Sequence, residues 1–407
     1  MDKRIIRNEK GSSSVFLVFI LAAMLSLTAA FVHIAWEMEV KSQGDGLLNL
    51  AGQSILSEFD LDLKEDYGLF GFYNGGAFLD YKIKNYVNYS LDGNDHGNLQ
   101  NANVNVKEYL LTDSTVFKRE LLEYMKFAIA KGIFEKSKSP AKEKPRKDRV
   151  LRNKKIINSL PSTKLGGGST GLLAIVEKLK SNIELLKNFT ENASKTYLID
   201  KYIIENFSHE LKQVPDRETF FTREVEYILE GNYSNKINGK KVKEGLVAFR
   251  TGLNLLFLYA DPEKSAETMA AAQAITPGPE AAATQAAIAA SWAYFEGKND
   301  LKLLKNGKKV VLFKSGRTWA LDINTVLKGT QGGFVDTGAN EGYDYKGYLE
   351  LFLHFKNENE KLARVMDLIQ LNMKGNHNKD FLIQDYNCGF QLDAQINGRQ
   401  HGHKYQY

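Results

Sequence analysis

An unbroken apolar run near the N-terminus constrains this chain more than any other feature. Residues 15–36 read VFLVFILAAMLSLTAAFVHIAW and contain no permanently charged side chain. As an α-helix this run would extend about 33 Å, which matches a hydrocarbon core of about 30 Å. The run therefore predicts one membrane-spanning helix. The mean hydropathy of −0.35 excludes a chain made mostly of such helices.

The flanks of the run predict its orientation. Residues 1–14 form a leader with four Lys or Arg side chains, whereas Glu37 and Glu39 follow the run. Because cytoplasmic flanks are enriched in Lys and Arg, we expect a single-pass protein of the cell membrane, with its N-terminus in the cytoplasm and the bulk of the chain extracytoplasmic. The alternative is a signal peptide cleaved after Ala30, but the apolar run continues past that site. Both interpretations export the rest of the chain.

The net charge of +5 is concentrated in one segment. Residues 136–155 carry ten basic and two acidic side chains, which leaves −3 for the rest of the chain. A nucleic-acid-binding protein would carry its basic stripe on a folded face, so we expect no nucleic-acid partner. Residues 136–171 are rich in Lys, Pro, Gly and Ser, which predicts a solvated linker. Such a linker could contact anionic lipids or acidic wall polymers.

The remaining patterns predict an α+β protein. We expect a stalk helix and a first α/β part in 37–135, a mainly helical part with short strands in 172–330, and a helix followed by a β-hairpin in 331–407. The dipeptide Asn397-Gly398 is a strong hairpin signal. We also expect the early and late strands to meet in one sheet around the helical middle.

Individual elements follow from local patterns. The alanine-rich stretch 265–295 is divided by Pro277-Gly278-Pro279, which predicts a helical hairpin. Residues 310–313 and 318–323 are predicted as strands, residues 345–373 as one long amphipathic helix, and residues 381–386 as a strand.

Two strings imitate catalytic signatures. Phe334-Val335-Asp336-Thr337-Gly338-Ala339 matches the aspartic-protease pattern, but no second Asp-Thr-Gly or Asp-Ser-Gly exists in the chain to complete a carboxylate dyad. Ser169 stands in a Gly-x-Ser-x-Gly string that lies in the predicted linker rather than after a strand. We interpret the first string as a turn and the second as part of the linker, so we predict no catalytic residue and no enzymatic activity.

Metal and cofactor sites are likewise not expected. Cys388 is the single cysteine, which excludes an intrachain disulfide and a cysteine-rich zinc site. His401 and His403 could offer two imidazoles to a metal, but no neighbouring residue supplies a third ligand at a recognisable spacing. We therefore interpret this segment as a frayed C-terminal strand and predict no metal ligands. No dinucleotide or phosphate-binding fingerprint is present, so we expect no cofactor.

Several segments together suggest a family. The basic leader, Gly11-Ser-Ser-Ser-Val-Phe before a single apolar run, AGQSILSEFD at 51–60 and YGLF at 67–70 resemble the pseudopilin-like TadE/TadG-type membrane proteins of tight-adherence (Tad/Flp) pilus systems, notably an uncharacterised branch in clostridia. REVEYIL at 223–229, ASWA at 290–293 and RVMDLIQLN at 364–372 are also similar to segments of that branch.

The resemblance implies a structural or assembly role in a pilus or surface secretion apparatus, with other apparatus proteins and the membrane as partners. In type IV-like pilins the processing peptidase cuts after a glycine, and a glutamate stands fifth beyond the cut; here the fifth residue after Gly11 is Phe16. We therefore expect a retained anchor. The alternatives are an exported hydrolase acting on the cell envelope and a tethered surface-binding module.

Overall fold

A computed structural model of the protein describes residues 10–74, 77–91, 99–132, 148–165, 171–181, 184, 186, 195–214, 217–329 and 335–407. Packing divides the chain into two discontinuous units. Unit 1 comprises Met1–Phe59, Phe72–Tyr109 and Asn387–Tyr407, and unit 2 comprises Asp60–Gly71 and Leu110–Tyr386. The continuous ranges predicted from the sequence do not follow this division, because the last strands return to an early one.

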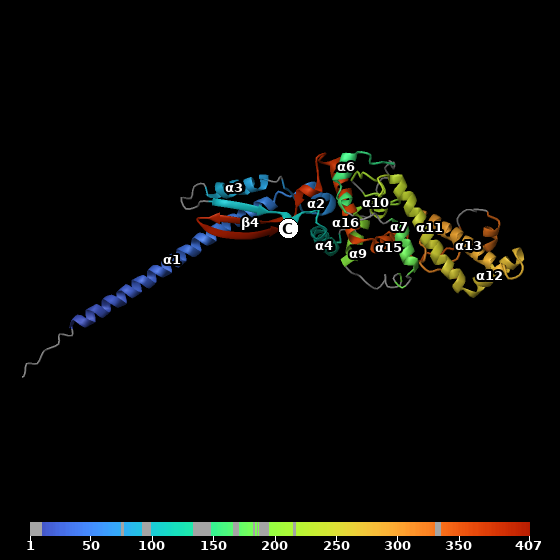
Figure 1. Cartoon of the computed structure of the whole chain (residues 1–407), viewed down its shortest axis with the longest axis horizontal. Coiled ribbons are helices and arrows are strands. Elements are labelled where there is room, and N and C mark those ends of the chain that lie inside the picture. The colour runs from blue at the N-terminus through green and yellow to red at the C-terminus, as the bar shows by residue number, and fades with distance from the viewer. Residues whose placement is uncertain are drawn as a thin grey trace, which may run out of the picture. The chain divides into compact units, whose positions relative to one another are not determined.

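Unit 1 contains the α-helices α1 and α3, a small three-stranded sheet and two short elements, β1 and η1 (Figure 1). In chain order, the elements are α1 (Lys10–Leu56), β1 (Phe72–Tyr73), α3 (Ala77–Leu91), β2 (Leu99–Asn105), η1 (Lys107–Tyr109), β4 (Gly389–Ile396) and β5 (Arg399–Gln406). The two-residue strand β3 (Tyr386–Asn387) lies at the boundary between the units.

Strands β2, β4 and β5 form an antiparallel sheet in that order. Ala102 on β2 is opposite Ala394 on β4, which in turn is opposite His401 on β5. Asn397 and Gly398 connect β4 to β5 with positive φ angles of 51° and 78°, as a two-residue hairpin turn requires. The predicted hairpin and the meeting of early and late strands are both confirmed.

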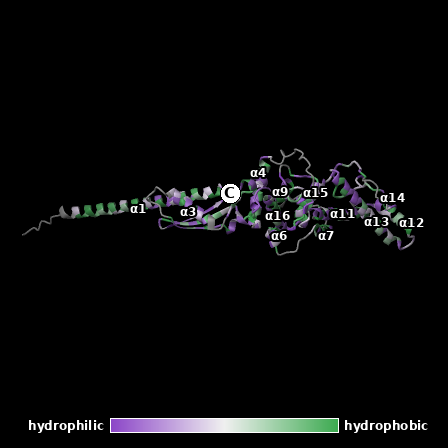
Figure 2. Cartoon of the chain, turned by 90° about the horizontal axis from the view of Figure 1, so that it is seen from above, coloured by the Kyte–Doolittle hydropathy of each residue, from purple (hydrophilic) through white to green (hydrophobic). Residues whose placement is uncertain are grey.

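Helix α1 changes character along its length. Figure 2 shows its N-terminal part as mainly apolar, and the side chains of 15–36 are exposed throughout. Among the described residues it is the one helix that is long and apolar enough to cross a membrane. Farther along, Leu48, Ala51 and Ile55 are buried. They join one apolar cluster with Ile83 of α3 and Leu392 of β4, so the second half of α1 packs against the sheet.

Unit 2 is mainly helical. Its longer helices are α4 (Ser114–Ala130), α7 (Leu172–Ser181), α9 (Lys195–Asn206), α11 (Asn235–Ala260), α12 (Pro262–Ile275), α13 (Ala281–Lys305), α15 (Tyr345–Phe355) and α16 (Glu358–Asn376). Its shorter elements are α2 (Leu61–Tyr67), α6 (Lys154–Ser159), η2 (Pro161–Lys164), α10 (Glu224–Glu230), α14 (Ile323–Leu327) and η3 (Ile383–Asp385). Helices α12 and α13 form the predicted alanine-rich hairpin, which packs around the buried Trp292.

The predicted strands at 310–313 and 318–323 are wrong. In the first segment Val310 makes an isolated bridge to Tyr343, and the next two carbonyls accept hydrogen bonds from Arg250. In the second segment, two main-chain N–H groups donate to the carboxylate of Glu296, each at 3.0 Å. Long polar side chains therefore satisfy these backbones in place of neighbouring strands.

The helix predicted over 345–373 is two helices. Lys356 is extended, with φ −70° and ψ 142°, and it separates α15 from α16. Asn357 then caps α16, because its side chain accepts a hydrogen bond from the Glu360 N–H. The strand predicted over 381–386 is also wrong: half of the segment forms η3, and only its last residue is in a strand, β3.

Part of the predicted linker is folded. Residues 148–165 contain α6 and η2, and Leu151 and Leu160 within them are buried. The main-chain N–H of Ser162 donates to the carboxylate of Asp367 on α16 at 3.0 Å. These two buried leucines hold the stretch in unit 2. The composition of residues 136–171 as a whole did not indicate this, because the segment has few large apolar residues. The most basic part of the linker, residues 136–147, and its glycine run at 166–170 lie outside the described residues.

Candidate functional site

The structure brings His401 and His403 together with an acidic residue of α1. Asp45 accepts from His401 Nδ1 at 2.7 Å and from His403 Nε2 at 2.9 Å, and both hydrogen bonds reach the same oxygen, Oδ1. One donor atom from each residue lies within 4.8 Å of the other two. In the described part of the chain, this is the one cluster of at least three His, Cys, Asp or Glu side chains with that spacing.

Local structure explains why the two imidazoles converge. His401 and His403 are alternate residues of β5, so they share one face of the sheet. Arg399 and Tyr405 belong to the same face, and all four face α1: Arg399 pairs with Glu37, and Tyr405 packs against Gly52. The expected frayed strand is therefore wrong, because β5 pairs with β4 along its whole length.

Small residues let the helix approach this strand. A methyl group added at Gly44 would lie 2.7 Å from Cε1 of His401, and one added at Gly52 would overlap the Tyr405 ring. Gly46, on the same helix, has open space around it. Glycine is an unfavourable residue inside a helix. At Gly44 and Gly52, however, its small size lets side chains of β5 contact α1.

The site combines a buried and an accessible part. The His401 side chain is 1% exposed, whereas those of His403 and Asp45 are 31% and 37% exposed. Asp45 lies nine residues beyond Trp36, outside the apolar run. Partial burial disfavours its ionised form, but the hydrogen bonds from His401 and His403 outweigh burial and lower the pKa of the Asp45 carboxyl. The arrangement can hold a cation or a proton beside an ionised carboxylate.

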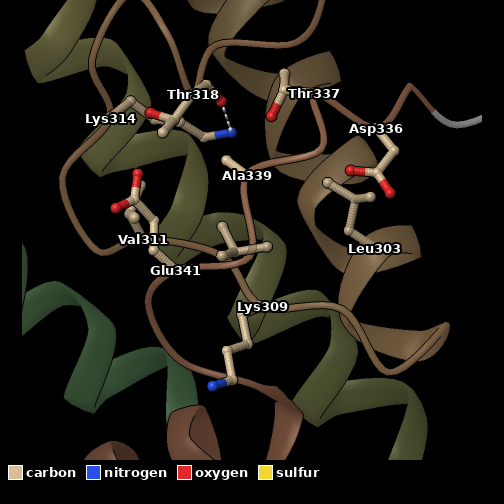
Figure 3. Close-up of a pocket in the computed structure, with 10 residues that line it drawn as sticks. Leu303, Lys309, Val311, Lys314, Thr318, Asp336, Thr337, Ala339 and Glu341 are labelled. Atoms are coloured by element: carbon tan, nitrogen blue, oxygen red, sulfur yellow. Dashed lines mark hydrogen bonds between the residues drawn. The ribbon is translucent and has the colours of Figure 1, made fainter.

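Asp336 lies in unit 2 beside a very small cavity, whose volume is about 20 Å³ (Figure 3). Its carboxylate accepts from the Gly338 N–H at 2.9 Å and pairs with Lys308 at 3.1 Å. These two contacts lower the pKa of the Asp336 carboxyl. Glu341 lines the other side of the cavity and pairs with Arg317. Residues 335–341 form no regular secondary structure, and Gly338 has a positive φ of 76°. Each of the two carboxylates at this cavity is paired with its own cation, unlike a catalytic dyad in which two carboxylates share one proton.

A second cavity in unit 2 is larger, with a volume of about 370 Å³. It is lined by residues from the start of α4, from η2 and from α16. Lys164 in its wall donates to Gln384 at 2.8 Å, and Asp113 accepts from two N–H groups at the start of α4. Its charged groups are thus engaged in structural hydrogen bonds. Ser169, the other nominal catalytic residue, lies outside the described residues.

Buried carboxylates gather instead in the centre of unit 2. Every residue of α10 is buried, and its glutamates accept hydrogen bonds from the main-chain N–H groups of Ser208, Glu210 and Leu172. Burial raises the pKa of Glu226 to about 7 and that of Asp367 on α16 to about 6. Most of the segment 223–229 lies in α10 and the segment 364–372 lies in α16, so these two stretches, from which a family was expected, are part of the packed interior.

The chain is thus an α+β protein with a long apolar N-terminal helix, a helical middle and C-terminal antiparallel strands. A family model matches residues 136–398, which is more than half of the chain, and the chain belongs to that family, DUF5702, a family of unknown function. The match includes Asp336 but ends before His401 and begins after Asp45. Neither a curated protein nor a solved structure matches the chain significantly.

Proposed function

We propose that this protein is a membrane-anchored, extracytoplasmic structural component of a pilus or surface secretion apparatus of the tight-adherence type. It acts by packing against other proteins of that apparatus. The observation that carries this proposal is the division of α1, whose apolar N-terminal half is exposed while its second half packs against a sheet. Such a helix suits a chain that is held in a membrane at one end and presents a folded unit at the other.

The orientation belongs to the same proposal. With the basic leader in the cytoplasm, the helix crosses the membrane once and both units lie outside it. The exposed apolar part of α1 could also pack against membrane helices of partner proteins. In a membrane, the surfaces that face lipid and the surfaces that face other helices are both apolar. The sequence resemblance to pseudopilin-like proteins points in the same direction.

A gene deletion combined with point variants tests this proposal. Deletion should impair assembly of the pilus or surface appendage. The variants Asp336→Asn and Ser169→Ala should leave assembly intact at normal protein levels, because a packing role requires no catalytic side chain. Loss of function in either variant, with abundance and fold preserved, would favour an exported enzyme instead. Normal appendages in the deletion strain would reject the assembly role.

A further inference from the structure

We propose that Asp45, His401 and His403 bind a divalent transition-metal ion of the zinc class. The proposal is independent of the pilus-type function, because it rests on three side chains of unit 1. They come from two elements that are far apart in the chain, helix α1 and strand β5. Their donor atoms nevertheless converge within 4.8 Å of one another.

The chemistry of the donors selects the class of metal. Imidazole nitrogen suits Zn²⁺ and the neighbouring transition metals, whereas Mg²⁺ and Ca²⁺ prefer sites built from oxygen alone. Two histidines and one carboxylate, with further positions left to water, are a ligand set that Zn²⁺ uses in proteins. Because Asp45 and His403 are partly exposed, solvent or a partner side chain can reach those positions.

The distances fit a site that opens slightly when a metal enters. Ligands around a tetrahedral zinc ion lie about 3.3 Å apart when each bond is about 2.0–2.1 Å. Asp45 Oδ1 is now 2.7 Å and 2.9 Å from the two ring nitrogens, so the donors must separate by only about 0.5 Å. His401 is packed over Gly44 and stays fixed, whereas the more exposed His403 and Asp45 have room to move.

Metal binding would fasten the C-terminal strand to the helix. Asp45 belongs to α1 beyond the apolar run, and the histidines belong to the last strand of the chain. A metal held by all three residues would cross-link the two elements and stabilise unit 1, because the unfolded chain cannot bring them together.

Metal titration of the full-length chain tests the proposal. The protein is purified in a non-ionic detergent without a histidine tag, treated with a chelator and titrated calorimetrically with ZnCl₂. We expect one site of micromolar or tighter affinity, and bound Zn²⁺ should raise the thermal unfolding midpoint. The variants His403→Ala and Asp45→Asn should each weaken Zn²⁺ binding at least about 100-fold. His403→Ala is preferred to a change at His401, whose buried ring also contributes to packing.

The matched control is His377→Ala in unit 2. His377 also contacts two carboxylates, Asp62 at 3.2 Å and Asp66 at 3.0 Å, but through its two opposite ring nitrogens. It therefore cannot share one metal with both, and its removal should leave Zn²⁺ binding unchanged. A wild-type chain that binds no Zn²⁺ at micromolar concentrations would overturn the proposal. So would a loss of less than about 10-fold in either site variant, because removing a ligand should cost more than that.

Discussion

Glu226 shows how a single buried side chain makes stability depend on pH. Its Oε1 accepts from the Glu210 N–H and from the Tyr345 hydroxyl, each at 2.9 Å, whereas its Oε2 is buried without a hydrogen-bond partner in the described part of the chain. Burial disfavours the charged form and raises the pKa of Glu226 to about 7, well above its ordinary value of 4.5. The folded state therefore binds this proton more tightly than the unfolded state.

The substitution Glu226→Gln should remove part of this pH dependence. A raised carboxyl pKa gives stability that is present below about pH 4.5 and is lost as the pH rises through about 7. Between pH 5 and pH 8 the wild type should lose about 2–3 kcal/mol relative to the variant. Urea unfolding in detergent, followed by tryptophan fluorescence, measures this difference. The exposed Glu177→Gln is the control, and parallel pH profiles for wild type and Glu226→Gln would contradict the prediction.

Residue-level sequence reasoning singled out two of the three residues of the cluster of Asp45, His401 and His403 but interpreted them as part of a frayed strand. His401 and His403 are visible as an alternating pair, but Asp45 is 356 positions away from His401. Only the pairing of β5 with β4 and the packing of α1 against the sheet bring the third donor into place. A weak hint existed in the glycines at 44 and 52, because a helix interior tolerates glycine best where a neighbour needs the space.

At the scale of elements, Arg250 links three helices and a loop. Buried on α11, it pairs with Asp300 of α13 at 2.9 Å and donates to the Tyr348 hydroxyl of α15 at 3.1 Å. It also donates to the carbonyls of Val311 and Leu312, which explains why the segment 310–313 needs no partner strand. The apolar pattern of that segment predicted a strand and could not show that a distant arginine satisfies its backbone.

We expect Arg250→Met to lower the free energy of unfolding of unit 2 by about 3–5 kcal/mol, because it leaves the Asp300 carboxylate buried with fewer partners. Arg317→Met is the matched control. Its pair with Glu341 is exposed, so removing it should cost less than about 1 kcal/mol. Trp292 and Trp319 lie in the α12–α13 core, so tryptophan fluorescence during urea unfolding reports on this unit. Equal losses in the two variants would show that the Arg250 network contributes little.

Elements with strong local signals were predictable, whereas the folded part of the linker, which depends on long-range contacts, was not. The alanine-rich hairpin and the Asn397-Gly398 turn follow from local backbone chemistry and are confirmed. The break between α15 and α16 also had a local signal, Asn357 followed three residues later by Glu360, which is a helix-start pattern. The folded part of the linker had no local signal of this kind. Two leucines among many polar residues do not show which part of the chain they pack against.

At the scale of the whole molecule, the central claim is that α1 anchors the chain in the membrane with both units outside. The long apolar helix itself was predictable, since length and hydropathy are local properties. The pairing of early and late strands was also expected, but the boundaries of the two discontinuous units were not, because the predicted ranges were continuous along the chain. Orientation follows from the charge of the flanks and is the part of the claim most open to a direct test.

Cysteine labelling tests this orientation most directly. In a Cys388→Ser background, Lys404→Cys introduces a thiol at an exposed position of β5, and Lys3→Cys introduces one in the leader. Cells whose outer envelope is permeabilised without opening the cytoplasmic membrane are treated with a membrane-impermeant maleimide. We predict labelling of Lys404→Cys before lysis and of Lys3→Cys only after it. Labelling of Lys404→Cys only after lysis, with Lys3→Cys labelled before it, would contradict the membrane topology proposed for this protein.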